Sequence, residues 1–196
     1  MGIIDFSQLS ARKEAKTKEA EAYPYDTYFP DSVSFIGEPW TTLAKHIGRI
    51  EQDSVINFWT FGRYAMHDLI SHICRQIGPC NVTACTWAIT EKAVTQILNR
   101  KKDGLIKEFR LWIDPRVKVR NPAPLQMCRA NFDVCIAPVH AKVAVIWNDQ
   151  WRISVSGSLN FTTNPQPERG VIQVIDHVFH SDKKILDEQF DTAAER

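Results

Sequence analysis

The chain alternates between apolar runs and segments in which apolar and polar residues recur at helical spacing. Residues 54–61 and 82–89 are nearly continuous apolar runs, which are typical of buried strands. Over residues 63–77 the apolar positions repeat at helical spacing, so we predict an amphipathic helix that Gly78 and Pro79 end. The same criteria predict four further elements: strand 33–36, helix 41–51, a helix that follows the N-cap residue Thr90, and strand 109–113.

The pattern changes after Pro115. Residues 114–130 contain three prolines and several basic groups, and we interpret them as an irregular excursion. A helix and four strands then complete the prediction, with strands at 132–137, 141–147, 151–156 and 170–176 and the helix at 181–193. This order predicts an α/β fold built on a mixed sheet. A charged helical arm and a Tyr/Pro-rich connector at 1–30 precede one domain at 31–196.

Composition narrows the choice of function classes. The chain has 196 residues, 44% hydrophobic and 24% charged, as in soluble globular proteins. It contains no apolar run of membrane-spanning length and no signal peptide at its start, so we expect a cytoplasmic protein with no membrane partner. Five irregularly spaced cysteines fit reduced thiols in that compartment. Because the formal net charge is only +1, affinity for nucleic acid would have to come from a local basic patch.

Two short segments carry the candidate chemistry, His140-x-Lys142 and Gly157-Ser158-x-Asn160. If residues 143–146 form a strand, alternation places His140 and Lys142 on the same face. An imidazole and an ammonium group repel each other when both are charged, so their pairing brings no structural benefit. A phosphate between them would explain the pairing.

These two motifs resemble the signature of the phospholipase D superfamily, in which H-x-K is followed by G-S-x-N, and Phe161-Thr162 continue as in that family. The resemblance extends from residue 33 through the last predicted helix. It implies a phospholipase D-like mixed β-sheet flanked by helices on both faces, with one repeat per chain. Short bacterial endonucleases of this family pair as homodimers, and the resemblance implies a homodimer here.

The resemblance also implies a role for each motif residue. His140 attacks phosphorus and forms a phosphohistidine, while the protonated His140 of the second copy donates to the leaving oxygen. Lys142 and Asn160 hold the non-bridging oxygens, Ser158 fixes the turn, and Glu168 orients the imidazole. No metal and no cofactor is implied.

The sequence departs from the family pattern at one position. The family has an Asp five residues after the lysine, whereas this chain has Trp147. The nearest acid is Asp149, two residues later, and a shifted hairpin would be needed to present it. In the family that Asp has an orienting and supporting role and does not attack the phosphate. Its loss therefore leaves the nucleophile in place.

Other residues are candidates for substrate contact. Arg116, Lys118 and Arg120 alternate at strand period and would project on one face as a phosphate-tracking rim; the alternative is a solvated edge strand. Gly157 is a further candidate for substrate contact; the alternative is a simple turn residue at the end of a strand. We assign the aromatic side chains to two groups: core residues Trp40, Phe58, Trp59 and Trp87, and the potential base-stacking residues Trp112, Trp147 and Trp151.

The function that fits these observations best is a metal-independent nuclease with a homodimer-shared site; DNA is favoured over RNA as the substrate, but the sequence does not decide between them. His67 and His72 do not indicate a metal site. They lie five residues apart on the predicted helix, so their side chains point in different directions around its axis. Two alternatives stay open. The first is a protein that has lost catalysis and binds nucleic acid through the same residues, which the Trp147 at the motif Asp position suggests. The second is a lipid phosphodiesterase. Fold analogy is only a weak guide to substrate.

Overall fold

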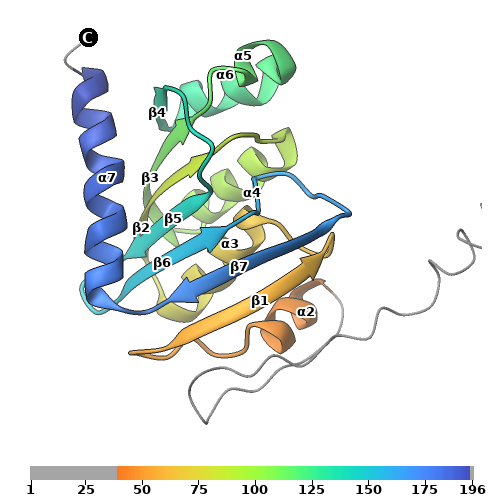
Figure 1. Ribbon diagram of the computed structural model, residues 1–196, viewed down its shortest axis with the longest axis vertical. Coiled ribbons are helices and arrows are strands. Elements are labelled where there is room, and N and C mark those ends of the chain that lie inside the picture. Colours follow the sequence, from red (N-terminus) through yellow and green to blue (C-terminus); the bar gives the residue numbers. More distant parts are fainter. Residues whose placement is uncertain (1–38, 195–196) are drawn as a thin grey trace, which may run out of the picture.

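The computed structural model describes residues 39–194, which form a seven-stranded mixed sheet between two layers of helices (Figure 1). The sheet order is β1-β7-β6-β5-β2-β3-β4. Only the β2–β3 and β3–β4 pairs are parallel, and the other neighbours are antiparallel. The strands are β1 (Val55–Phe61), β2 (Cys80–Thr86), β3 (Ile106–Ile113), β4 (Asp133–Ile136), β5 (Val143–Trp147), β6 (Arg152–Gly157) and β7 (Pro167–Gln173).

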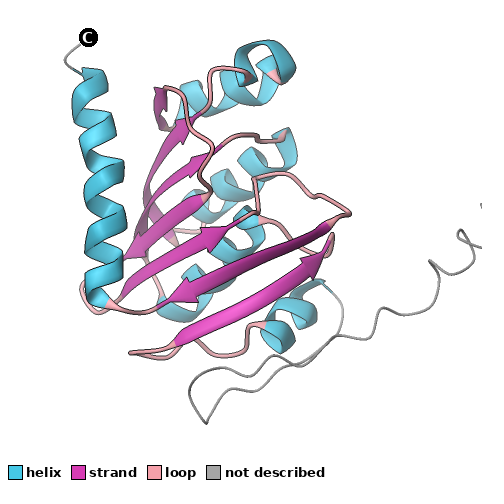
Figure 2. Cartoon of the chain, viewed as in Figure 1, coloured by secondary structure: helices cyan, strands magenta, loops and turns pink. Residues whose placement is uncertain are grey.

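Helices cover both faces of this sheet, as Figure 2 shows in cyan against magenta strands. The helices are α2 (Pro39–His46), α3 (Met66–Ile77), α4 (Glu91–Lys102), α5 (Val117–Arg120), α6 (Pro122–Asn131) and α7 (Asp176–Ala194). Helices α3 and α4 pack on one face and α7 on the other. Local sequence explains their boundaries: the Thr90 hydroxyl accepts from Ala93 N at the start of α4, and Gly78 ends α3 with a φ of 80°.

The two faces bury apolar clusters of different size. The larger cluster lies under α3 and α4, where α3 contributes fully buried residues such as Leu69 and Ile73. The smaller one lies under α7 and includes Val145, Phe179 and Leu186. Because both faces are covered, β2 is buried at six of its seven positions, including its polar residues Thr83 and Thr86.

Most predicted elements are confirmed within one to five residues, and the predicted fold class is confirmed as well. The irregular excursion over 114–130 is wrong, because this segment forms α5 and α6. Pro122 and Pro124 lie in the first turn of α6, where a missing N–H leaves no hydrogen bond unmade. The buried strand over 54–61 also needs correction: β1 is an edge strand with alternating burial.

Two expectations fall outside the described residues, namely the arm and connector at 1–30 and the strand at 33–36. Within residues 39–194, no helix combines the length and the apolar character needed to cross a membrane.

Candidate phosphate-binding site

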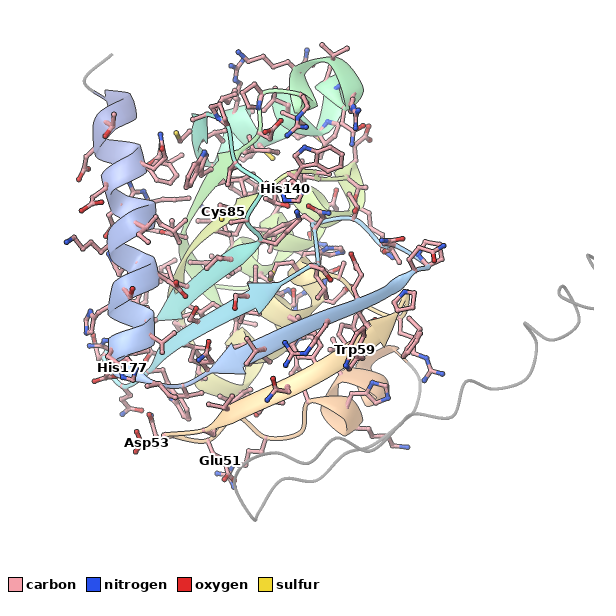
Figure 3. The ribbon with its side chains drawn as sticks, in the orientation of Figure 1. Glu51, Asp53, Trp59, Cys85, His140 and His177 are labelled. Atoms are coloured by element: carbon pink, nitrogen blue, oxygen red, sulfur yellow. The ribbon has the colours of Figure 1, made fainter. Side chains whose placement is uncertain are left out.

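The candidate residues gather at one end of the sheet, where β2 ends, β5 begins and β6 ends. Register brings them together: the N–H of Gly157 donates to the carbonyl of Lys142 at 3.1 Å, and β2 meets the start of β5 at the pair Cys85–Val143. Figure 3 shows His140 and Cys85 at this end and His177 at the opposite end of the sheet. His140, Lys142 and the Gly157–Asn160 segment are therefore neighbours in space, as the motif spacing predicts.

Asn160 is held from several sides in an extended turn. Its neighbours Leu159 and Phe161 are fully buried and anchor the turn in the core. The Thr86 hydroxyl lies 3.2 Å from the Asn160 Oδ1 and donates to it, and the Asn160 carbonyl accepts from Met66 N at the start of α3. The hydrogen bond to Oδ1 fixes the orientation of the amide, and its Nδ2 group can then donate to an anion.

Ser158 and Gly157 join β6 to β7. The Ser158 Oγ accepts from the backbone N–H of Arg169 at 3.1 Å, and the Ser158 N–H donates to the Arg169 carbonyl at 2.9 Å. A Cβ on Gly157 would lie 2.4 Å from that carbonyl oxygen and 2.7 Å from the Cα of Gly170. The glycine is thus required by the close approach of two backbones, a structural reason that is independent of any substrate contact.

Lys142 is buried although it carries a charge. Only 8% of its surface is exposed, and Nζ donates to the carbonyl of His140 at 2.6 Å. Burial lowers the pKa of Lys142, and the nearby Glu168 carboxylate partly opposes that shift. A poorly solvated ammonium group with one neutral hydrogen-bond acceptor is well suited to bind an anion.

His140 itself is exposed, and its ring lies 6.3 Å from the indole of Trp87. The prediction that strand alternation aligns it with Lys142 is wrong, because both residues precede β5 at Val143. The two residues are instead linked through the hydrogen bond from Lys142 to the His140 carbonyl. The imidazole remains accessible while the lysine beneath it is enclosed.

Glu168 lies in β7 with 5% of its surface exposed. Its Oε1 accepts from the Asn164 amide at 3.4 Å, while Oε2 has no hydrogen-bond partner among the described residues. Burial raises the pKa of this carboxyl, and Lys142 acts in the opposite direction. The predicted contact with His140 is not formed within the single chain, which leaves one buried carboxylate oxygen without a donor.

The unusual residue Trp147 lies at the other end of β5. Its ring packs against Phe179 of α7, with a centroid distance of 6.0 Å, and Lys183 Nζ lies 4.9 Å from it. Asp149 is exposed in the hairpin beyond that end. Neither residue is near His140, so position 147 supports the α7 face and not the phosphate site.

The basic segment is a helix, so the predicted strand-period rim is wrong. Arg116 and Arg120 are one helical turn apart and both lie over the ring of Trp87, at 5.0 and 5.1 Å, whereas Lys118 has no such contact. Trp87 is only half-buried at the site, which corrects its assignment to the core. Trp112, in contrast, packs with the α7 cluster and donates to the carbonyl of Ala137.

Asp114 is a site residue that sequence reasoning missed. Its carboxylate is buried and accepts from Arg116 Nε at 2.6 Å and Nη2 at 3.0 Å, which holds its pKa well below the usual range. It also accepts from Val139 N, directly before His140. The signal was available in the sequence, since Asp114 is a lone acid at the end of an apolar strand, two residues before an arginine.

The described residues contain no group of three His, Cys, Asp or Glu side chains placed to hold a metal ion. The charged groups near Lys142 are instead Glu168 and Arg116, and Arg116 is paired with Asp114. The site therefore combines an accessible imidazole, a buried ammonium and an oriented amide at one strand end.

Comparison with known proteins gives a likeness in structure only. No family model matches the chain, and no curated protein matches its sequence. NucT from Helicobacter pylori is similar in structure, with 15% identity and a TM-score of 0.55 over 70% of this chain and 97% of NucT. Polyphosphate kinase from Porphyromonas gingivalis has 12% identity and a TM-score of 0.52 over 69% of this chain, which spans about a quarter (26%) of that enzyme. The chain therefore shares the α/β fold of NucT, a mixed sheet with helices on both faces.

Proposed function

We propose that this chain is a phosphodiesterase of the phospholipase D superfamily that hydrolyses nucleic acid through a phosphohistidine intermediate. The observation that carries the proposal is the placement of an accessible His140 against the buried ammonium of Lys142 and the oriented amide of Asn160. The structural similarity to NucT supports the fold on which this chemistry would run.

The reaction would proceed in two displacements. A neutral His140 nitrogen attacks phosphorus, the phosphorus–oxygen bond to the leaving group breaks, and a proton from a general acid goes to that oxygen. Water then attacks the phosphohistidine, a base takes its proton, and the free imidazole is regenerated. Lys142 and Asn160 offset the negative charge that develops on the non-bridging oxygens, so no metal is needed for this step.

The general acid would come from a second copy of the chain. In this homodimer His140 of one subunit attacks and His140 of the other protonates the leaving oxygen. The unpartnered Oε2 of Glu168 supports the arrangement, because a buried carboxylate oxygen without a donor is unfavourable and an imidazole N–H at the interface would satisfy it. Glu168 would then orient a catalytic histidine.

Nucleic acid is the substrate class we favour, with DNA before RNA. The rim beside His140 carries the guanidinium groups of Arg116 and Arg120. Among the described residues the exposed large apolar side chains are Phe61, Val119 and Ile185, on three different elements, which offers little surface for a lipid chain. Phosphate backbones, in contrast, bind basic side chains strongly.

The test is cleavage of plasmid and single-stranded DNA in EDTA by the wild type and by His140→Ala. We expect cleavage by the wild type and complete loss in the variant, which should fold normally because His140 is exposed. His177→Ala, an exposed histidine at the opposite end of the sheet, is the matched control and should retain full activity. A phosphorylated wild-type protein, trapped by acid quenching, would identify the intermediate.

Four results would contradict this proposal. Cleavage by His140→Ala would show that His140 is not the nucleophile. Activity that EDTA abolishes and a divalent ion restores would indicate metal-dependent hydrolysis. Binding of DNA without cleavage by the wild type would indicate the second candidate, a phosphate clamp that has lost catalysis, and activity confined to phospholipid micelles would indicate the lipid alternative.

The shared site has its own test. Wild-type protein at fixed concentration is mixed with an increasing excess of His140→Ala, with time for subunit exchange. We expect activity to fall as the excess rises, because mixed dimers contain a single His140. Constant activity would show that each chain works alone and would refute the shared site.

A further inference from the structure

The half-buried Trp87 occupies an unusual place for a large aromatic side chain. It follows β2 directly, at the polar rim of the site, and its indole N–H is buried without an acceptor among the described residues. Buried tryptophans usually find a partner for this group. Places where a sequence breaks such a rule are often functional.

The backbone on both sides of Trp87 is fixed. The hydroxyl of Thr86 lies within hydrogen-bond distance of Asn160 Oδ1, and the carbonyl of Ala88 accepts from Phe161 N at 3.1 Å. The same turn that presents Asn160 therefore also positions Trp87. An aromatic ring held this way loses little conformational entropy when a ligand stacks on it.

Two guanidinium groups complete the cluster, and they differ in their charge balance. Arg116 is paired with the buried Asp114, so its charge is largely compensated. Arg120 lies 5.1 Å from the ring centre of Trp87 and forms no ion pair within the described part of the chain. Arg120 thus offers uncompensated positive charge beside the ring of Trp87, and the His140 imidazole lies 6.3 Å from the same ring.

We propose that Trp87, Arg116 and Arg120 form a subsite for an unpaired nucleotide next to the scissile phosphate, which selects single-stranded over double-stranded nucleic acid. A base can stack on an indole or on a guanidinium plane only after it has left the duplex stack, whereas phosphate contacts alone do not distinguish the two forms. The inference rests on the proposed function only in taking nucleic acid as the ligand.

Binding is measured by fluorescence anisotropy in the His140→Ala background, so that cleavage does not interfere. The probes are a labelled single-stranded oligonucleotide, the duplex of the same sequence, and an abasic oligonucleotide of the same length. Trp87→Ala should weaken binding of the single strand about tenfold and leave the duplex within about twofold. The abasic probe should bind the parent weakly and be insensitive to Trp87→Ala.

Two further variants separate stacking and charge from loss of folding. Trp87→Phe keeps an aromatic face and should retain most of the single-strand affinity. Arg120→Ala should reduce the salt dependence of binding by roughly one slope unit for the lost phosphate contact, whereas the matched control Lys118→Ala, on the same helix but away from Trp87, should leave it unchanged.

The outcomes distinguish this inference from the proposed function. Equal losses for single strand and duplex in Trp87→Ala, or equal losses in Trp87→Phe and Trp87→Ala, would overturn the subsite even if cleavage is observed. Wild-type protein that binds single strands through Trp87 but cleaves nothing would leave the subsite intact and overturn the nuclease. No binding of any probe by the parent would overturn both.

Discussion

The two ends of strand β5 satisfy their polar groups very differently. At the hairpin end, the side chain of Asn148 makes four hydrogen bonds to backbone groups of the hairpin and of the turn between α3 and β2. At the other end, buried polar atoms of Trp87 and Glu168 have no partner among residues 39–194, and Lys142 is enclosed with a charge. Since selection for stability alone would satisfy both ends, the contrast supports the proposal that a ligand or a second copy binds at the unsatisfied end.

Lys142→Met should have the largest effect on cleavage and is the strongest test of this contrast between the two ends. Cleavage should fall by about 10²–10³-fold, because the variant loses the charge that stabilises the phosphoryl transition state. Folding stability should be unchanged or higher by about 1 kcal/mol, since a buried charge with one neutral acceptor is replaced by an apolar side chain. Initial rates and urea denaturation measure the two quantities.

The matched control for Lys142→Met is Arg152→Met at the hairpin end, where the guanidinium donates to backbone carbonyls. This variant should lose stability and keep its specific activity. If Lys142→Met unfolds the protein while Arg152→Met inactivates it, the contrast between the two ends is wrong.

A smaller effect is expected from Trp147→Asp, which restores the residue of the family signature. We expect a loss of about 3 kcal/mol in the free energy of unfolding, because the ring packs against Phe179 and the α7 face cannot solvate a carboxylate. Cleavage per folded molecule should not increase, since the position is at the far end of β5. An increase in specific activity would break the comparison, and Trp147→Phe should recover most of the stability.

The smallest effect concerns acid stability. Burial lowers the pKa of His67, against an opposing effect of Asp68 and an additional lowering by Lys92, and burial also lowers the pKa of His46 and His72. Below the ordinary value of 6.5 the unfolded chain binds protons that the folded chain does not, so stability falls as the pH drops from 6.5 to the lowered pKa values.

This pH dependence can be assigned with one variant. His67→Phe keeps a ring stacked on Phe161 and should reduce the loss of stability between pH 7 and pH 5, by at most about 1.4 kcal/mol for each pH unit. Urea denaturation at several pH values measures it, and His177→Phe serves as the exposed control. An unchanged pH profile in His67→Phe would show that the other histidines carry the effect.

Periodicity in the sequence was sufficient to predict the central sheet and α3, α4 and α7, because burial of one helix stripe or of a whole strand leaves a strong pattern. Helices α5 and α6 were missed because the three prolines of residues 114–130 suggested a loop, although Pro122 and Pro124 lie in the first turn of α6, where a proline is compatible with a helix. The edge position of β1 depends on pairing with β7, which lies over a hundred residues later, and no local pattern reports such a pairing.

The motif residues could be proposed from the sequence because H-x-K and G-S-x-N are local patterns. Their support could not, since Asp114, Thr86 and Trp87 reach the site only through the order of strands β2 and β3. The unpartnered Oε2 of Glu168 is likewise a property of packing, and only the structure reveals it.

The glycine pair that joins β6 to β7 limits how this protein can drift in sequence. A Cβ on Gly170 would lie 2.3 Å from the ring of Phe58, so a smaller residue at position 58 would make room for it. A Cβ on Gly157 would meet backbone atoms of Arg169 and Gly170, and no exchange of side chains can move those. Evolution can therefore reach substitutions at position 170 after a change at position 58, at the cost of a cavity in the core, whereas position 157 has no such route.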